Sequence, residues 1–122
     1  MVLIENEATL TREKLFEVLS TNPGIIIIKF EADWCRPCKL ADMYIKKRLE
    51  TLNDQVSYIS TDVDDSFDLY AFLKSKKMVN GIPAVLAYIK GNTEYVSDFC
   101  VMGADENEIN AFFDQLESTL QN

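Results

Sequence analysis

One segment of this 122-residue chain restricts the possible folds more than any other. Residues 25–31 read Ile-Ile-Ile-Ile-Lys-Phe-Glu, so the segment is β-branched and almost continuously apolar. Such a run is typical of a strand with both faces covered, as in the middle of a sheet packed between helices. The segment therefore predicts a layered fold built around one central strand.

Four other segments carry helix patterns. Apolar residues at helical spacing predict helices over residues 11–20, 35–52, 64–76 and 105–120. Thr11 is the expected N-cap of the first helix, and Asp64 or Asp65 that of the third. Asp105, with Glu108 in the capping-box position, is expected to begin the fourth.

Short apolar runs between these helices predict further strands over residues 2–4, 56–61, 84–90 and 94–101, the last two joined as a hairpin at Gly91-Asn92. The order β-α-β-α-β-α-β-β-α predicts the α/β class. We expect an α/β/α sandwich whose central mixed sheet of four to five strands is flanked by four helices. With no repeat and no linker-like stretch, residues 1–122 are expected to form a single domain.

The charge balance is acidic, with 20 Asp and Glu against 12 Lys and Arg and a net charge of −8. Such a surface repels nucleic acid and anionic membranes, so neither is an expected partner, and we expect a monomer. The longest apolar run falls far short of the ~20 residues of a membrane span. Because the first residues lack the features of a secretory signal or transit peptide, a cytoplasmic location is expected. The absence of histidine removes the commonest general base and the commonest metal ligand.

The candidate chemistry lies in Cys35-Arg36-Pro37-Cys38, where the central strand leads into a helix. Backbone N–H groups in the first turn of a helix have no partner within the helix, and together with the helix dipole they favour a thiolate at Cys35. The charges of Arg36 and Lys39 act in the same direction. Settings of this kind lower a cysteine pKa from about 8.5 to roughly 3.5–7.5. Pro37 suits the first turn, and Cys38 lies one turn from Cys35, within reach of a mixed disulfide formed there.

Two other interpretations of the pair remain open at this point. A zinc site normally needs four nitrogen or sulfur ligands, whereas the chain has three cysteines and no histidine, so no metal is expected. Alternatively, both thiols are inert core residues, as buried cysteines often are.

Several segments together resemble the thioredoxin family. Residues 32–39, Ala-Asp-Trp-Cys-Arg-Pro-Cys-Lys, are similar to its active-site motif, and Gly81-Ile82-Pro83 stands where the family has a cis-proline loop. Asp62-Val63-Asp64 resembles the acidic segment that ends a strand in this family, and Gly103 resembles its late active-site glycine. The similarity extends over residues 2–120.

The resemblance implies a thiol–disulfide oxidoreductase that reduces disulfides in protein substrates. Cys35 would be the nucleophile, and Cys38 the resolving thiol that closes the Cys35–Cys38 disulfide. No cofactor beyond this redox-active disulfide is implied, and a thioredoxin-reductase-like protein would supply the electrons. The alternative is a binding or scaffold module that holds a partner protein, with redox activity secondary.

The resemblance also implies a substrate groove. Pro83 would be cis and packed against the two sulfurs, and Ile82 would offer its backbone to an extended substrate segment. Trp34 and Met102 would line the groove. The simpler alternatives are an ordinary trans proline in a turn, and a tryptophan and a methionine that belong to the core.

Four positions depart from the family pattern. Lys29 replaces a buried aspartate that helps to move the proton of the second cysteine, and Glu31 replaces a tryptophan. Ser60 stands where a lysine often pairs with that aspartate, and Met43 replaces a proline that kinks the helix. Lys29 and Glu31 alternate onto one face of a strand, so we expect them to pair beneath the cysteines and to change how Cys38 is deprotonated. The alternative is that Lys29 extends its amine to solvent and has no chemical role.

Two more residues lead to expectations about redox behaviour. Arg36, where glycine is commoner in the family, should stabilise the thiolate and make the couple more oxidising. Cys100 is expected to be a small buried apolar residue, with regulation or dimerisation through an intermolecular disulfide as the alternative.

Overall fold

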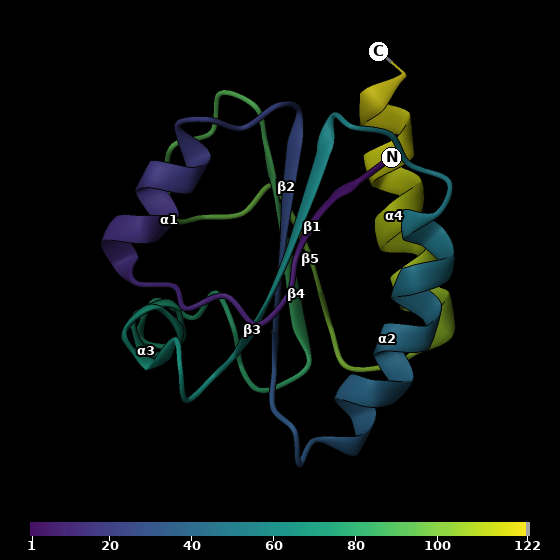
Figure 1. The fold of residues 1–122 in the computed structure, drawn as a ribbon. Helices are drawn as coiled ribbons and strands as arrows, with labels where there is room; N and C mark the ends of the chain where they lie inside the picture. The colour runs from purple at the N-terminus through teal and green to yellow at the C-terminus, as the bar shows by residue number, and fades with distance from the viewer. Residues whose placement is uncertain (122) are drawn as a thin grey trace.

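A computed structural model describes residues 1–121 (Figure 1). Its element order is the one predicted from the sequence. The elements are β1 (Leu3–Glu5), α1 (Arg12–Leu19), β2 (Ile25–Glu31), α2 (Arg36–Leu49), β3 (Val56–Asp62), α3 (Phe67–Ser75), β4 (Ala84–Ile89), β5 (Phe99–Met102) and α4 (Glu106–Leu120).

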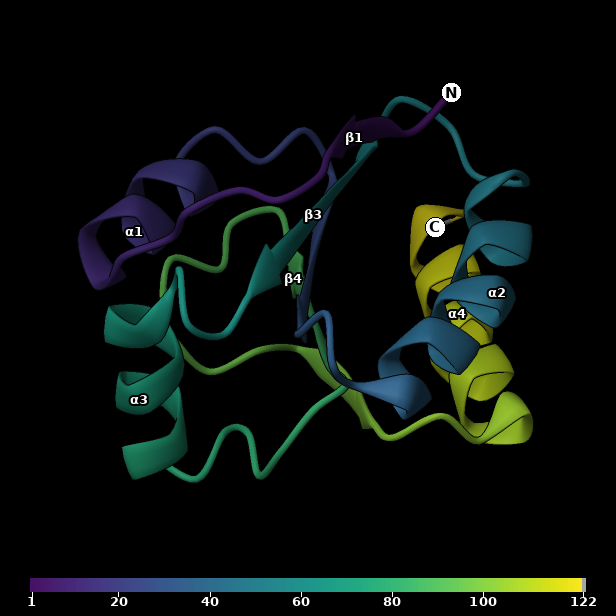
Figure 2. The same cartoon turned by 60° about the horizontal axis from the view of Figure 1, so that its bottom comes forward.

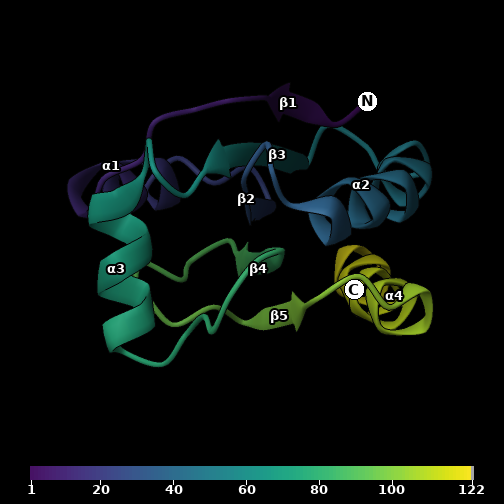
Figure 3. The same cartoon turned by 90° about the horizontal axis from the view of Figure 1, so that it is seen from below.

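The strands form one mixed sheet in the order β1-β3-β2-β4-β5. Figure 3 shows this order from one edge of the sheet to the other. β2 is the central strand: it pairs in parallel with β3 along one side and antiparallel with β4 along the other. The predicted mixed sheet of four to five strands is confirmed and has five, and the central position of the isoleucine run is confirmed as well.

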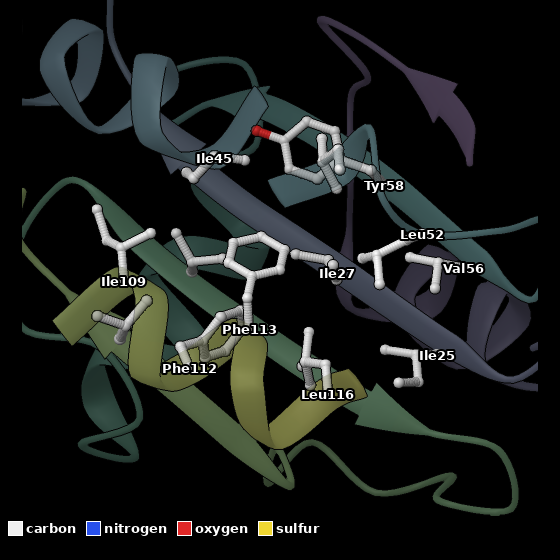
Figure 4. Packing of buried hydrophobic residues seen from close by; sticks show 14 of the residues in the cluster. Ile25, Ile27, Ile45, Leu52, Val56, Tyr58, Ile109, Phe112, Phe113 and Leu116 are labelled. Atoms are coloured by element: carbon white, nitrogen blue, oxygen red, sulfur yellow. The ribbon is translucent and has the colours of Figure 1, made fainter. Parts of the chain in front are cut away.

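Two helical layers cover the sheet, with α1 and α3 on one face and α2 and α4 on the other (Figures 1 and 2). Alternate residues of β2 enter different cores, which explains why the strand is apolar at nearly every position. Ile25 and Ile27 pack in the cluster beneath α2 and α4, part of which is drawn in Figure 4. Ile26, Ile28 and Phe30 pack in the cluster beneath α1 and α3.

Two of the predicted helix caps are confirmed. Thr11 Oγ1 accepts a hydrogen bond from the Lys14 N–H (3.1 Å), and Asp105 Oδ1 accepts one from the Glu108 N–H (2.9 Å). Each cap satisfies a backbone donor that the helix itself cannot. None of the helices within residues 1–121 is both long and apolar enough to cross a membrane.

The predicted cap of α3 is wrong. The helix begins at Phe67 after Ser66, not after Asp64 or Asp65, and Ser66 makes no side-chain cap. The Ser66 hydroxyl instead accepts the Leu10 N–H (2.7 Å), and the Asp64 N–H donates to Asp62 Oδ1 (2.8 Å). The bond from Asp64 to Asp62 forms a turn in the segment where the sequence predicts helix, while the Ser66 hydroxyl is occupied by a residue distant in the sequence.

Two other predicted boundaries also differ. α2 ends at Leu49 rather than at residue 52, because residues 50–52 close in tighter turns in which the Leu52 N–H donates to the Leu49 carbonyl (3.1 Å). The hairpin predicted around Gly91-Asn92 is a longer loop, and β5 is only four residues long. Asp98 Oδ2 accepts the Ile89 N–H (2.7 Å) and the Asn92 amide (3.0 Å), so side chains take the place of ladder partners.

Arg48 fastens the C-terminal end of α2 to α4. Its guanidinium donates to the Asn110 carbonyl (2.9 Å), forms an ion pair with Asp114 (2.8 Å) and lies over the ring of Phe113. Only 17% of the Arg48 side chain is exposed, so these bonds are partly shielded from water. The end of α2 that is remote from the cysteines is therefore held in place.

Truncating the core under α4 should destabilise the fold strongly. Phe113 is fully buried in the cluster beneath α2 and α4, so Phe113→Ala is expected to lower the free energy of unfolding by about 3–5 kcal/mol. Phe16→Ala removes the same ring from an exposed position on α1 and should change it by less than about 0.5 kcal/mol. Urea unfolding followed by circular dichroism measures both; equal losses would contradict the assignment of this core.

Candidate active site

Three segments meet at one end of the sheet. The loop that follows β2 carries Cys35, and β4 runs antiparallel to β2 with Ala84 opposite Phe30, so residues 82–83 lie beside this loop. β5 ends at Met102 opposite Ala84. The Gly103 N–H donates to the Pro83 carbonyl (2.9 Å), which fixes the third segment against the second. The structure thus places the predicted site segments together.

Cys35 and Cys38 form a disulfide at the start of α2, with Cα atoms 5.3 Å apart. Cys35 is the N-cap of the helix, and its Sγ accepts a hydrogen bond from the Cys38 N–H (3.2 Å). The contact shows that an otherwise unpartnered amide of the first turn points at this sulfur, as the sequence predicts. An N–H donor at this position stabilises negative charge on Cys35 when the disulfide opens.

The disulfide lies in a small apolar cluster. Cys35 is 4% exposed and Cys38 is 2% exposed, and both pack with Ala32 in this cluster. Val63 and Ile82 pack against the cluster. The apolar surroundings restrict the access of water to the sulfurs. A reacting partner must therefore make direct contact with the sulfur of Cys35.

The other predicted groove residues differ in their exposure. Trp34 is 72% exposed, so it is not a core residue. The Ile82–Pro83 peptide bond is cis, as the resemblance implies, and Pro83 is buried. Met102 is partly buried and packs against the cluster beneath α1 and α3, as Ile82 also does. Trp34 and Ile82 thus offer apolar surface beside the disulfide, while Met102 offers only part of its side chain.

The residues between the cysteines leave positive charge on the surface. Pro37 lies within the first two positions of α2, where its missing N–H costs nothing. Arg36 and Lys39 are exposed, and neither forms an ion pair with another residue of the described chain. Their charges are therefore not neutralised by direct ion pairs within the described chain.

Lys29 lies behind the disulfide with only 1% of its side chain exposed. Its ammonium forms ion pairs with Glu31 (2.7 Å) and Asp42 (3.0 Å) and donates a hydrogen bond to the carbonyl oxygen of Cys38 (3.0 Å). The predicted Lys29–Glu31 pair is confirmed, and the alternative in which Lys29 reaches solvent is wrong. A buried ammonium is costly unless it is paired in this way.

Asp42 is a member of this cluster that sequence reasoning missed. It also pairs with Lys46 (3.1 Å), one turn further along α2. Partial burial would raise the pKa of Asp42, but hydrogen bonds and charge from Lys29 and Lys46 outweigh it and hold the pKa below its usual value of 3.8. The spacing of Cys38, Asp42 and Lys46, four residues apart on one helix face, was the available signal.

Cys100 does not have the predicted environment. The prediction that it is buried is wrong, because its thiol is exposed on the edge strand β5. Val101 of this strand is buried in the cluster beneath α2 and α4, and Cys100, the residue before it, points to the opposite face of the edge strand. Within residues 1–121, no group of three or more His, Cys, Asp or Glu side chains is arranged to hold a metal ion.

Comparison with known proteins gives the family. The family model described as Thioredoxin matches residues 6–115. Thioredoxin from Oryctolagus cuniculus is 32% identical over 82% of this chain and 88% of its own length. The chain belongs to the thioredoxin family.

Other relatives agree on the fold and differ in length. Thioredoxin 3 from Plasmodium falciparum is 31% identical over 92% of this chain, and the mitochondrial thioredoxin of Mus musculus is 31% identical over 75%. The chain spans only 58% and 51% of the lengths of these two proteins. The solved structure of Trichomonas vaginalis thioredoxin is similar with a TM-score of 0.70 and 26% identity, covering 94% of this chain and 96% of that one.

The Lys29 cluster should make stability depend on pH through Asp42. A carboxyl whose pKa is lowered by folding stabilises the protein above its unfolded pKa of 3.8, and this contribution is lost as the pH falls through the lower folded value. Asp42→Asn should therefore lower the free energy of unfolding at pH 7 by about 1.5–3 kcal/mol, the range for hydrogen bonds to charged groups. The difference from wild type should shrink below about pH 4. Urea titrations at pH 7 and pH 3 measure it; a difference that stays constant would contradict this account.

Proposed function

We propose that this protein is a thiol–disulfide oxidoreductase that reduces disulfides in protein substrates. The observation that carries the proposal is the Cys35–Cys38 disulfide at the N-terminus of α2, where the Cys38 N–H is directed at Cys35 Sγ. Membership of the thioredoxin family supports the same activity. The enzyme class is protein-disulfide oxidoreductase, with the two cysteines as the redox centre and no added cofactor.

The reaction begins from the reduced dithiol. The thiolate of Cys35 attacks one sulfur of a substrate disulfide, which breaks the substrate S–S bond and releases its other sulfur as a thiolate. Cys38 then attacks Cys35 Sγ, forms the Cys35–Cys38 bond and releases the second substrate sulfur. The substrate gains two electrons and two protons, and the enzyme is left as the disulfide observed here.

The apolar surface beside the disulfide is the docking site in this proposal. Trp34 and Ile82 offer it directly, with Met102 at its margin. A substrate segment can align with the backbone at Ile82–Pro83, which precedes β4. The negative net charge favours partners that are neutral or basic.

Regeneration of the dithiol needs an electron donor, and a thioredoxin-reductase-like protein fits this role. We expect the chain to act as a monomer. The cytoplasmic location stays a prediction, since relatives include mitochondrial forms. The alternative role as a pure binding module is not favoured, because a scaffold has no need of two cysteines held at bonding distance.

Reduction of insulin by dithiothreitol tests the activity. The wild-type protein should accelerate it, and Cys35→Ser should remove at least about nine-tenths of the acceleration because the nucleophile is lost. Cys38→Ser should accumulate a mixed disulfide at Cys35, visible by mass spectrometry. The matched control is Cys100→Ser, which removes the remaining thiol and should keep the wild-type rate. A wild-type protein with no effect on insulin would leave only the binding-module interpretation.

Arg36 should raise the reduction potential. Interaction with a nearby exposed positive charge stabilises a thiolate by about 0.5–1 kcal/mol. This free energy corresponds to a change in reduction potential of roughly 10–20 mV for a two-electron couple. Arg36→Gly should therefore make the couple more reducing by that amount, whereas Arg36→Lys keeps the charge and should change it little. Equilibration with glutathione buffers measures the potential. A shift of Arg36→Gly toward more oxidising values would contradict the argument.

A further inference from the structure

The charged cluster of Lys29, Glu31 and Asp42 lies behind the disulfide and has no role in the reaction described above. Lys29 is the one charged residue in the buried part of the described chain. Its ammonium holds Glu31 and Asp42 next to the turn of α2 that carries Cys38. A single buried cation thus fixes two carboxylates close to the resolving thiol.

Two cavities meet at these carboxylates. The smaller has a volume of about 100 Å³ and is lined by Cys38 together with Lys29, Glu31 and Asp42. The larger has a volume of about 280 Å³ and is lined by Glu31 and Asp42 again, and by Tyr58. Since one water molecule occupies about 30 Å³ of liquid, both cavities have room for water. Glu31 and Asp42 therefore stand between the space beside Cys38 and a space that reaches the surface at β1.

The two carboxylates differ in their free capacity to accept a proton. Asp42 pairs through one oxygen with Lys29 and through the other with Lys46, and these contacts lower its pKa. Glu31 pairs with Lys29 through Oε1, and its Oε2 forms no ion pair within residues 1–121. Glu31 is 30% exposed, so it can also pass a proton on. Of the two, Glu31 is the carboxylate with an oxygen that no ion pair within residues 1–121 occupies.

The remaining charged and titratable groups around the route are few. Asp33 and Lys39 line the smaller cavity, and Glu7 and Lys46 line the larger one. Burial, with the charges of Asp42 and Glu31, raises the pKa of Tyr58, so its hydroxyl stays protonated at neutral pH.

The Tyr58 hydroxyl is buried and has no hydrogen-bond partner among the residues of the described chain. Figure 4 shows the Tyr58 ring among the apolar side chains of the cluster beneath α2 and α4, with the hydroxyl oxygen at its margin. It is therefore available to bind water in the larger cavity.

We propose that Glu31 accepts the proton of Cys38 in the resolving step, through water in the smaller cavity, and returns it to solvent through the larger cavity, behind the docking surface. The inference rests on the proposed function. In the mixed disulfide, the Cys38 thiol gives its proton to Glu31, and the thiolate attacks Cys35 Sγ. The Cys35–Cys38 bond forms, the bond from Cys35 to the substrate breaks, and the substrate sulfur leaves with the electron pair and takes a proton from solvent. Lys29 is the positioning residue, which holds Glu31 in place.

The experiment separates the two halves of the reaction with 5,5′-dithiobis(2-nitrobenzoate). The reduced full chain, in a Cys100→Ser background so that the exposed thiol does not react, is mixed with an equimolar amount of the reagent. Attack by Cys35 releases the first thionitrobenzoate, and attack by Cys38 on the mixed disulfide releases the second. Stopped-flow absorbance resolves both releases between pH 5 and 9, and Cys38→Ser identifies the first.

Glu31→Gln should slow the second release about tenfold or more at pH 6–7, because a thiol with a pKa of about 8.5 is ionised there to only a few per cent or less without a base, and leave the first release within about twofold. The deficit should vanish toward pH 9, where a thiol with a pKa of about 8.5 ionises without help. Asp42→Asn should slow the second release less than Glu31→Gln does. Lys29→Met should slow it as well, since Glu31 loses its fixed position. Glu50→Gln, the same change at an exposed position at the end of α2, should match wild type.

The outcomes distinguish this inference from the proposed function. A normal first release with a second release that is the same in Glu31→Gln and Glu50→Gln at every pH overturns the role of Glu31 alone. Asp42→Asn as slow as Glu31→Gln overturns it too, because both would then act only by holding Lys29. A missing first release in the Cys100→Ser protein overturns the proposed function and this inference with it. If Lys29→Met does not fold, the comparison of Glu31→Gln with Asp42→Asn still decides the question.

Discussion

The pairing of β2 along both of its sides is the constraint on which the site depends. Its parallel register with β3 and its antiparallel register with β4 fix where the strand ends and where residue 84 lies opposite it. The loop with the two cysteines starts at that end, and the cis Ile82–Pro83 bond precedes the partner strand. Both faces of β2 are apolar, so its isoleucines alone do not set this register. A slip by one residue would instead turn Lys29 away from Asp42 and into the apolar cluster beneath α1 and α3. Site geometry is therefore a consequence of how β2 is paired and of where its one buried charge lies.

The buried lysine gives this site a different electrostatic character from one built on a buried acid. A cation fixed behind the sulfurs, bound to the Cys38 carbonyl, favours negative charge in front of it. The amides of the first turn of α2 act in the same direction from the other side. Because the carboxylates that balance Lys29 are partly exposed, the charge is compensated at the surface rather than in the core. The disulfide therefore lies in a low-dielectric environment, while protons can still reach solvent through the partly exposed carboxylates.

Most of the architecture was predictable from the sequence because the relevant signals are local. The spacing of apolar residues gave the element order, and Thr11 and Asp105 gave correct helix starts. The errors arose where side chains compete for backbone partners, as Ser66 does before α3 and Asp98 does before β5. The Lys29–Glu31 pair followed from strand alternation, whereas Asp42 belongs to another element and its contact depends on how α2 is placed over β2. The exposure of Cys100 depends on which face of the edge strand β5 is covered, which no local pattern shows.

The contacts that hold α2 at both ends affect how a partner protein can distinguish the oxidised chain from the reduced one. Near the cysteines the helix is tied to β2 through Lys29, and at its far end Arg48 ties it to α4. Neither tie includes a sulfur atom, so opening the disulfide leaves both intact. We therefore expect the backbone surface presented to other proteins to be nearly the same in the oxidised and the reduced chain. A partner that prefers one form must recognise the sulfurs and the charge they carry, rather than a change of shape.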